Sequence, residues 1–131
     1  MKTATFRTSL PIAPVPASRP RVTRRGHVYY GKSYSKFRAE AGRFLERFVP
    51  PKDLPIGADV ELDVTFYCRR PKTTKRSHPR GDVDNYLKTL DVLNGILWHD
   101  DDQIIRVNAR KEFSDEPRIE LEVTYGEFRE T

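Results

Sequence analysis

An alternation of apolar and polar residues predicts four β-strands. The clearest lies at residues 58–68, where the apolar positions are Val60, Leu62, Val64, Phe66 and Cys68. Residues 3–10, 103–113 and 119–125 alternate in the same way. Turn-forming residues at 114–117 separate the last two strands, so we expect them to pair as an antiparallel hairpin.

Apolar residues spaced three or four apart predict two helices. The first covers residues 33–48, with a stripe of Phe37, Ala41, Phe44, Leu45 and Phe48. Ser33 or Ser35 is the expected N-cap. The second covers residues 82–97, with a stripe of Tyr86, Leu87, Leu90, Leu93 and Leu97. The order β, basic arm, α, β, α, β, β predicts one α+β domain over residues 1–131, with a small mixed sheet and two main helices.

Residues 11–31 form the basic arm of that order. Four prolines in the first half of the segment exclude a helix, and its arginines make it an extended basic stretch. Gly26 offers a turn between Val22 and residues 27–30, so a small hairpin is expected there.

Composition narrows the class of protein. Of the 131 residues, 37% are hydrophobic and 33% charged, which suits one modest core. Uninterrupted apolar stretches of only about three residues argue against a membrane span, and residues 1–30 show no secretory signal. The single cysteine, Cys68, argues against an internal disulfide framework and favours a reducing compartment. We therefore expect a soluble cytoplasmic protein with no membrane partner.

Charge is distributed unevenly along the chain. The net charge is +5, but residues 1–81 hold 18 basic and 6 acidic side chains, whereas residues 82–131 hold 6 and 13. A basic half favours a polyanionic partner, and clustered carboxylates favour cation binding. Solvated faces of opposite sign that pair with each other explain the asymmetry equally well.

The carboxylates gather around the second predicted helix. Asp82 and Asp84 lie where a loop enters that helix, and their side chains converge if Asp82 is still extended. Asp84, Lys88 and Asp91 then follow one helical face towards the aspartates at 100–102. Two or three aspartates and a substrate phosphate form a normal Mg²⁺ ligand set, beside which Lys88 could stabilise a phosphodiester under attack. The simpler alternative is that these aspartates cap a helix and form a polar turn.

Other catalytic sites find little support in the sequence. The three histidines have no metal-ligand spacing with Cys68, which argues against a zinc site. Glycine-rich phosphate-binding loops are absent from the sequence, so we expect no nucleotide cofactor, and serine or cysteine nucleophiles lack a local signature. Trp98 is either a core anchor or a platform for a DNA base.

At these residues the sequence resembles the RusA-type Holliday junction resolvases, Mg²⁺-dependent endonucleases that cut four-way DNA junctions. The family pattern Asp-x-Asp-Asn-x-x-Lys matches residues 82–88, and its later Asp-Asp-x-Gln element matches residues 100–103. Weaker matches are Asp-x-Leu-Asn-Gly at 91–95, Arg-Pro-Arg at 19–21, Gly-x-x-Tyr at 26–29 and a basic residue at Lys111.

The resemblance implies a set of site residues. Asp82, Asp84 and Asp101 would be the metal-binding catalytic carboxylates, with Lys88 as the essential basic residue and Asp100 as a neighbouring acidic ligand. Asp102 is the alternative if the register of the three aspartates shifts by one. The stretch from Lys88 to Asp91 is one residue shorter than in the common form of the family. Whether Asp91 corresponds to the aspartate of the family pattern therefore stays open.

The resemblance also implies cofactor and partners: Mg²⁺, with Mn²⁺ as a substitute, branched DNA, and a second copy of the chain in a homodimer. The residues expected to contact DNA are Arg19, Arg21, Arg24, Arg25, Lys32, Arg69, Arg70, Lys72, Lys75, Arg76, Arg80 and Lys111. A branched-DNA or flap nuclease of broader specificity and a DNA-binding module without catalysis remain alternatives. Members of this family are often carried by prophages, an origin that the residues of this chain do not themselves indicate.

Overall fold

The computed structural model describes residues 2–48 and 54–128. Its elements are β1 (Lys2–Leu10), β2 (Arg21–Val22), β3 (Val28–Tyr29), α1 (Lys32–Arg47), β4 (Asp59–Cys68), α2 (Val83–Leu87), the 3₁₀ helices η1 (Lys88–Leu93) and η2 (Asp101–Gln103), β5 (Ile104–Phe113) and β6 (Arg118–Glu127). The expected α+β class, with a mixed sheet and two helices, is confirmed. No helix among the described residues is long and apolar enough to cross a membrane.

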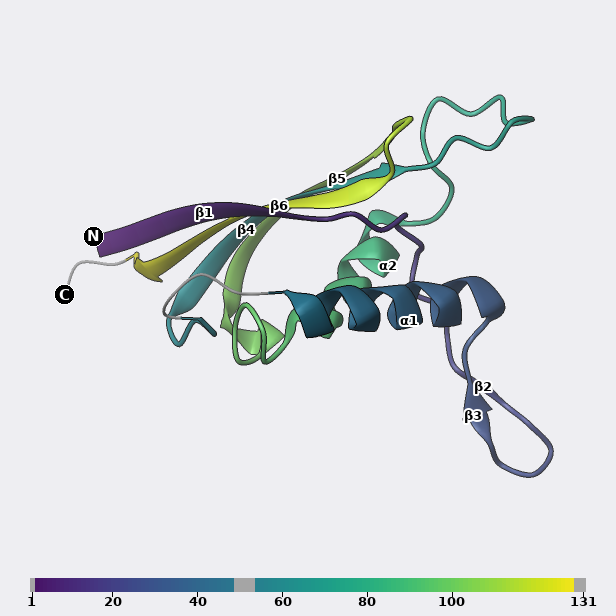
Figure 1. The fold of residues 1–131 in the computed structure, drawn as a ribbon, viewed down its shortest axis with the longest axis horizontal. Helices are drawn as coiled ribbons and strands as arrows, with labels where there is room; N and C mark the ends of the chain where they lie inside the picture. The colour runs from purple at the N-terminus through teal and green to yellow at the C-terminus, as the bar shows by residue number, and fades with distance from the viewer. Residues whose placement is uncertain (1, 49–53, 129–131) are drawn as a thin grey trace.

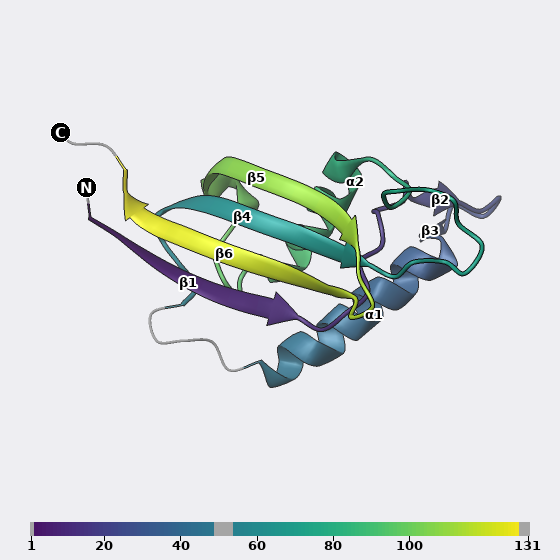
Figure 2. The same ribbon diagram turned by 90° about the horizontal axis from the view of Figure 1, so that it is seen from above.

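One four-stranded sheet organises the chain, in the order β1-β6-β4-β5 (Figure 2). β4 runs parallel to β5 and antiparallel to β6, and β1 is antiparallel to β6. Both helices lie against the same face of this sheet (Figure 1). That face carries the buried side chains of the alternating strand β4, so the core lies between sheet and helices.

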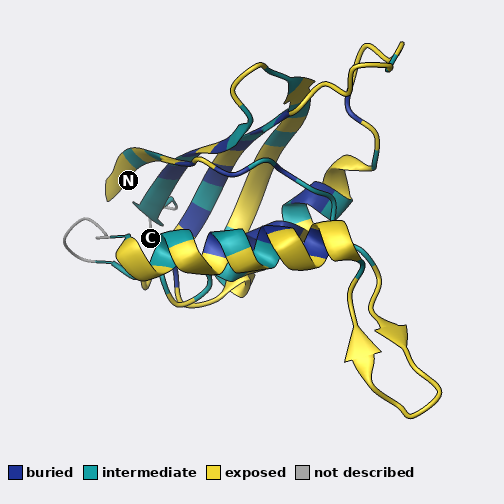
Figure 3. Ribbon diagram, turned by 45° about the vertical axis from the view of Figure 1, so that its right-hand side comes forward, coloured by how far each residue is buried: buried dark blue, intermediate teal, exposed yellow. Residues whose placement is uncertain are grey.

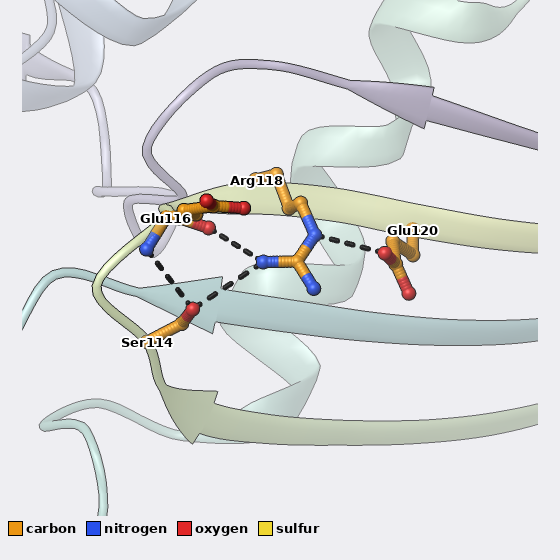
Figure 4. A network of polar contacts seen from close by, with 4 residues as sticks. All are labelled: Ser114, Glu116, Arg118 and Glu120. Atoms are coloured by element: carbon orange, nitrogen blue, oxygen red, sulfur yellow. Dashed lines mark hydrogen bonds and ion pairs between the residues drawn. The ribbon is translucent and has the colours of Figure 1, made fainter.

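The predicted hairpin between the last two strands is wrong, because β4 lies between β5 and β6. β4 is the strand with the most regular burial, and it gains a partner on each edge from this arrangement. The turn after β5 crosses the end of β4, where the Ser114 amide donates to the Cys68 carbonyl at 2.9 Å. The Arg118 guanidinium holds this turn through the Ser114 hydroxyl and the Glu116 carbonyl, and it also pairs with Glu120 (Figure 4).

The second predicted helix is shorter than expected. α2 spans five residues and continues as the 3₁₀ helix η1, and the chain from Asn94 to Trp98 is not helical. Leu87, Leu90 and Leu93 are spaced by three, which matches the three residues per turn of a 3₁₀ helix. The buried Thr89 hydroxyl also donates to the Tyr86 carbonyl at 2.6 Å.

The first helix matches its predicted range to within one residue at each end, but its N-cap differs. Gly31 occupies that position, and both serines proposed as caps lie inside the helix. Phe37 and Ala41 are buried as expected. The expected hairpin in the basic arm is confirmed as the pair β2–β3.

Trp98 is a core anchor. It is fully buried, and its indole nitrogen donates to the Asn94 side chain at 2.8 Å. Stacking of this ring on a DNA base, the alternative reading of the sequence, would require it to leave the core.

Candidate active site

Asp82 lies at the point where the chain changes from an extended loop to α2. Its backbone is extended (φ −74°, ψ 142°), and its carbonyl accepts the amides of Asn85 and Tyr86 at 3.0 and 3.4 Å. Its side chain makes no capping hydrogen bond. The carboxylate is therefore not used to cap the helix, and both it and the exposed Asp84 side chain face solvent.

Two side chains hold the three backbone carbonyls that precede Asp82. The Lys111 ammonium, reaching from β5, donates to the Pro79 carbonyl at 2.7 Å and also to the Gly81 carbonyl. The Tyr86 hydroxyl, reaching from α2, donates to the Arg80 carbonyl at 2.6 Å. We call this arrangement the carbonyl clamp. It fixes the approach of the chain to Asp82 from two separate elements.

Gly81 and the basic arm complete this support. Gly81 has φ +99°, a conformation that L-residues with a side chain rarely adopt, and an added Cβ would lie 3.2 Å from Pro16. The Ala17 amide donates to the Asn85 carbonyl at 2.8 Å. The proline-rich part of the arm is thus packed against the start of α2.

The hydroxyl in the clamp remains a donor over a wide pH range. Burial, helped by the neighbouring Cys68, raises the pKa of Tyr86 above its ordinary value. Burial also raises the pKa of the Cys68 thiol. Both groups are therefore neutral at physiological pH, and the Tyr86 proton stays available to the Arg80 carbonyl.

Lys88 is exposed one turn after Asp84 and bonds with a neighbouring side chain. Its ammonium donates to the Asn85 amide oxygen at 3.2 Å. This single contact orients the lysine along the surface of α2 and leaves donor capacity for an anion.

The acidic turn is held in place by one glutamine. The Gln103 amide oxygen accepts the His99 and Asp100 amides at 2.8 and 2.9 Å. Its nitrogen donates to the Ile56 and Ala58 carbonyls, each at 2.8 Å, which attaches the turn to the start of β4. Asp100 is the N-cap of η2, and its backbone carbonyl accepts the Gln103 amide at 3.0 Å.

Asp101 lies in a cluster of acidic and amide groups. A hydrogen bond with Asp100, slight desolvation and the charges of Asp100 and Asp91 raise the pKa of Asp101, and a hydrogen bond with Asn94 opposes this shift. The structure therefore brings the end of η1 and the acidic turn together. Excess negative charge of this kind is relieved when a cation binds.

Asp91 also has a cationic partner on α1. Arg38 forms an ion pair with it at 3.2 Å and donates to the Tyr34 hydroxyl at 3.1 Å. The ion pair thus connects α1 to η1, a contact that the helical face predicted from the sequence did not include.

Across residues 2–48 and 54–128, no three acidic, histidine or cysteine side chains are close enough together to hold a metal ion. Asp82 and Asp84 lie at one end of the α2–η1 segment, and Asp101 contacts its other end through Asn94. The ligand set of Asp82, Asp84 and Asp101 therefore remains a prediction.

Most of the predicted DNA contacts are exposed, in the arm, at the start of α1 and in the loop 69–80. Within that loop, Arg70 packs over Phe113 at 4.3 Å and donates to the Arg76 carbonyl at 3.3 Å. Lys111 is the exception, because its ammonium is occupied by the carbonyl clamp. A groove of about 750 Å³ runs between the proline-rich arm and this loop, with Arg76 and Arg80 among its lining residues.

Sequence reasoning missed the supporting roles of Asn85, Tyr86 and Gln103. Asn85 and Gln103 lie within the two acidic motifs. An amide side chain among carboxylates was the feature of the sequence that could have indicated their supporting role. The contact of Tyr86 with a carbonyl six residues earlier had no signal in the periodicity, because the ring was assigned to the apolar stripe.

Two comparisons with known proteins bear on this site. The family model Endodeoxyribonuclease RusA matches residues 11–124, a range that contains the arm, the clamp and both acidic segments. An uncharacterized protein of Bacillus subtilis (strain 168), YqaN, is 30% identical over 128 residues, covering 82% of this chain and 87% of its own length. RusA proteins are metal-dependent hydrolases that cut DNA at branched junctions. The extent of the family match, together with the uncapped Asp82 and the acidic turn, establishes that this chain belongs to the RusA endodeoxyribonuclease family.

Proposed function

We propose that this protein is a Mg²⁺-dependent endonuclease that resolves four-way DNA junctions by paired phosphodiester hydrolysis. The observation that carries the proposal is the geometry of the chain at the start of α2. There the carbonyl clamp fixes the backbone before Asp82, and the carboxylate itself is left uncapped. A helix cap alone would not need such support.

The available donors suit Mg²⁺. Asp82, Asp84 and Asp101 are exposed and offer the carboxylate oxygens that this ion prefers, and Mg²⁺ usually keeps several waters beside one or two carboxylates and a substrate phosphate. The raised pKa of Asp101 is the expected property of a carboxylate in a metal-free acidic cluster. When bound, the ion would neutralise phosphate charge and make a coordinated water more acidic.

The side chains of the chain perform the remaining tasks. Lys88, oriented by Asn85, reaches towards the phosphate and stabilises the extra negative charge that forms when water attacks phosphorus. Asp100 keeps the acidic turn in shape, and Asp102 is the ligand if the register differs by one. In this hydrolysis the water oxygen forms a new bond to phosphorus and the bond from phosphorus to one strand oxygen breaks. A proton from the water passes through solvent to the leaving oxygen, so the nick has a phosphate on one side and a hydroxyl on the other.

The basic residues hold the DNA arms. The arm, the start of α1 and the loop 69–80 carry exposed arginines and lysines, and contacts of this kind give affinity with a steep dependence on salt. Tyr86 and Arg80, which stands two residues before Asp82, line the groove between the arm and this loop, and we propose this groove as the path of the cut strand.

A homodimer would supply two active sites for two symmetric nicks. The edge strand β5 offers apolar surface for such contact, because Ile105 is 53% and Val107 43% exposed. Sedimentation of the purified protein would test this part separately: a monomer at micromolar concentration would contradict it.

The deciding experiment is cleavage of an end-labelled four-way junction, with and without Mg²⁺, beside a flap and linear duplex. We expect paired symmetric nicks that require the metal and spare the duplex. Equal rates on flaps and junctions would instead support a broader nuclease, and tight binding without nicks in Mg²⁺ or Mn²⁺ would support a binding module.

Asp82→Asn tests the site itself. It should lower cutting by more than about 100-fold, the upper end of what loss of a supporting residue costs at a metal site. Junction binding should be retained or become tighter, because a repulsive charge is removed. The matched control is Asp63→Asn, an exposed aspartate on the uncovered face of the sheet. Wild-type cutting by Asp82→Asn would show that the site is assigned wrongly.

A further inference from the structure

The β2–β3 hairpin stands away from the rest of the fold. Residues 19–30, which we call the finger, are all exposed, and they project from the end of the molecule that also carries the loop 69–80 (Figures 1 and 3). The finger follows directly on the part of the arm that contacts the start of α2, where the Ala17 amide donates to the Asn85 carbonyl and Pro16 lies against Gly81. The finger therefore extends from the support of the candidate site without being part of the site.

The finger exposes an unusual amount of apolar surface. Val22 is 65%, Val28 66% and Tyr29 46% exposed, and Tyr30 is exposed as well. These are four of the seven exposed large hydrophobic residues among the described residues. Apolar side chains gathered on one projection, rather than scattered singly over the surface, point to a contact surface.

The hairpin presents this surface in a defined shape. The Thr23 amide donates to the His27 carbonyl at 2.8 Å, the Gly26 amide to the Thr23 carbonyl at 2.9 Å, and the His27 amide to the Thr23 hydroxyl at 3.1 Å. Tyr30 anchors the base, because its ring packs edge-on against Tyr34 of α1 with centroids 5.0 Å apart. The apolar side chains are thus held in place rather than carried on a loose loop.

Strand pairing gives the finger two sides. Val22 lies opposite Val28, and Arg21 lies opposite Tyr29. Since neighbouring residues of a strand point to opposite faces, the valine pair forms one face and the arginine–tyrosine pair the other. The second face combines a flat aromatic ring with a cation.

The charge of the finger favours a nucleic acid over a second copy of the finger as the occupant. No aspartate or glutamate occurs before Glu40, whereas the finger carries Arg19, Arg21, Arg24 and Arg25. A second copy of the finger would bring like charges together. A DNA strand supplies phosphates for the arginines and, where bases are unstacked, flat surfaces for Tyr29 and the valines.

We propose that the finger enters the centre of a branched DNA substrate, where Tyr29 stacks on a base at the branch point and the valine pair packs against the adjoining base step. Bases at a branch are less constrained by stacking than those inside a duplex, so inserting the finger there costs less. On this proposal the finger selects branched over linear DNA. The proposal rests on the junction-cutting function proposed above.

The test compares affinities for a four-way junction and for linear duplex of equal length, measured without divalent metal. We expect Tyr29→Ala to weaken junction binding about 10-fold while duplex binding is unchanged, and Tyr29→Phe to restore it, because phenylalanine keeps the stacking ring. The double variant Val22→Thr/Val28→Thr, which keeps the β-branched shape, should lose junction preference in the same way. Arg24→Gln/Arg25→Gln is the matched control. It should weaken binding to junction and duplex together and reduce the slope of log affinity against log salt concentration by the amount expected for about two lost phosphate contacts.

The possible outcomes separate the two proposals. A wild-type protein with no preference for the junction overturns the proposed function and this inference together. If the wild type prefers the junction and Tyr29→Ala retains that preference, or loses both substrates equally, only the inference is overturned. Loss of binding to phosphatidylserine vesicles by the finger variants, with an unchanged junction preference, would assign the finger to a membrane surface instead.

Discussion

Replacement of Lys111 by methionine tests whether the carbonyl clamp supports the active site. The substitution keeps the aliphatic length of the side chain and removes the ammonium that holds the Pro79 and Gly81 carbonyls. A hydrogen bond to a charged group is worth about 1.5–3 kcal/mol. The two bonds share one partly buried donor, so we expect the free energy of unfolding to fall by about 2–3 kcal/mol rather than by twice the single value. At about 3 °C per kcal/mol for a chain of this size, Tm should fall by about 6–9 °C.

Loss of the clamp should also change the metal requirement. With the backbone before Asp82 released, the carboxylate spends less time in a position to bind a cation. We therefore expect Lys111→Met to need more Mg²⁺ for half-maximal junction cutting, while its affinity for the junction stays close to that of the wild type. Thermal unfolding by circular dichroism and a Mg²⁺ titration of single-turnover cleavage measure the two effects.

The control is Arg110→Met, which removes a cation from the neighbouring position of β5 on the uncovered face of the sheet. It should change the free energy of unfolding by less than about 0.5 kcal/mol. If Lys111→Met instead weakens junction binding with unchanged Tm and an unchanged Mg²⁺ requirement, then Lys111 contacts DNA, as the sequence predicted, and the clamp reasoning is refuted.

Three further predictions follow from the site. Gly81→Ala should lower the free energy of unfolding by about 1–3 kcal/mol and reduce cutting, because its positive φ is strained for alanine; denaturant melts and cleavage assays measure both. Asp101→Asn should raise Tm of the metal-free protein at pH 7. Asp100 raises the pKa of Asp101 in the folded protein, so the wild type loses stability as pH rises through that pKa. The Tm advantage of Asp101→Asn over the wild type should therefore disappear below about pH 3.9, where the carboxyl is protonated in both states; thermal melts over a pH series measure it. Arg38→Met should lower the free energy of unfolding by less than about 1 kcal/mol, since its ion pair with Asp91 is solvent-exposed; a larger loss in urea melts would contradict this.

The sequence predicted local elements well because their periodicity is a local property. The strand around Val60–Cys68 and the first helix follow directly from alternation and from an apolar stripe. The order of strands in the sheet, in contrast, is not a local property. Nothing in residues 103–125 indicates that β4 takes the place between β5 and β6, since that depends on which strand buries most surface at the centre of the sheet.

The sequence predicted which residue types form the candidate site, but it did not predict the contacts that hold them in place. Asp82, Asp84 and the acidic turn are visible as carboxylates near a predicted helix. The carbonyl clamp is not visible in the sequence. Lys111 contacts backbone carbonyls about thirty positions earlier, and a contact with backbone atoms does not depend on the side-chain pattern. The 3₁₀ segment was missed for a related reason, since the spacing of Leu87, Leu90 and Leu93 fits either helix type.

The position of β6 in the sheet has a consequence for the order of folding. β6 pairs with β1 on one edge and with β4 on the other, and the hydroxyls of Thr5 and Thr124 meet at 3.0 Å across 119 positions of the chain. Contacts this distant in sequence form late and slow the folding of a domain. During synthesis, β1 has no partner in the sheet until residues 118–127 have left the ribosome. The nascent chain therefore exposes its basic arm and finger well before the nuclease fold can close.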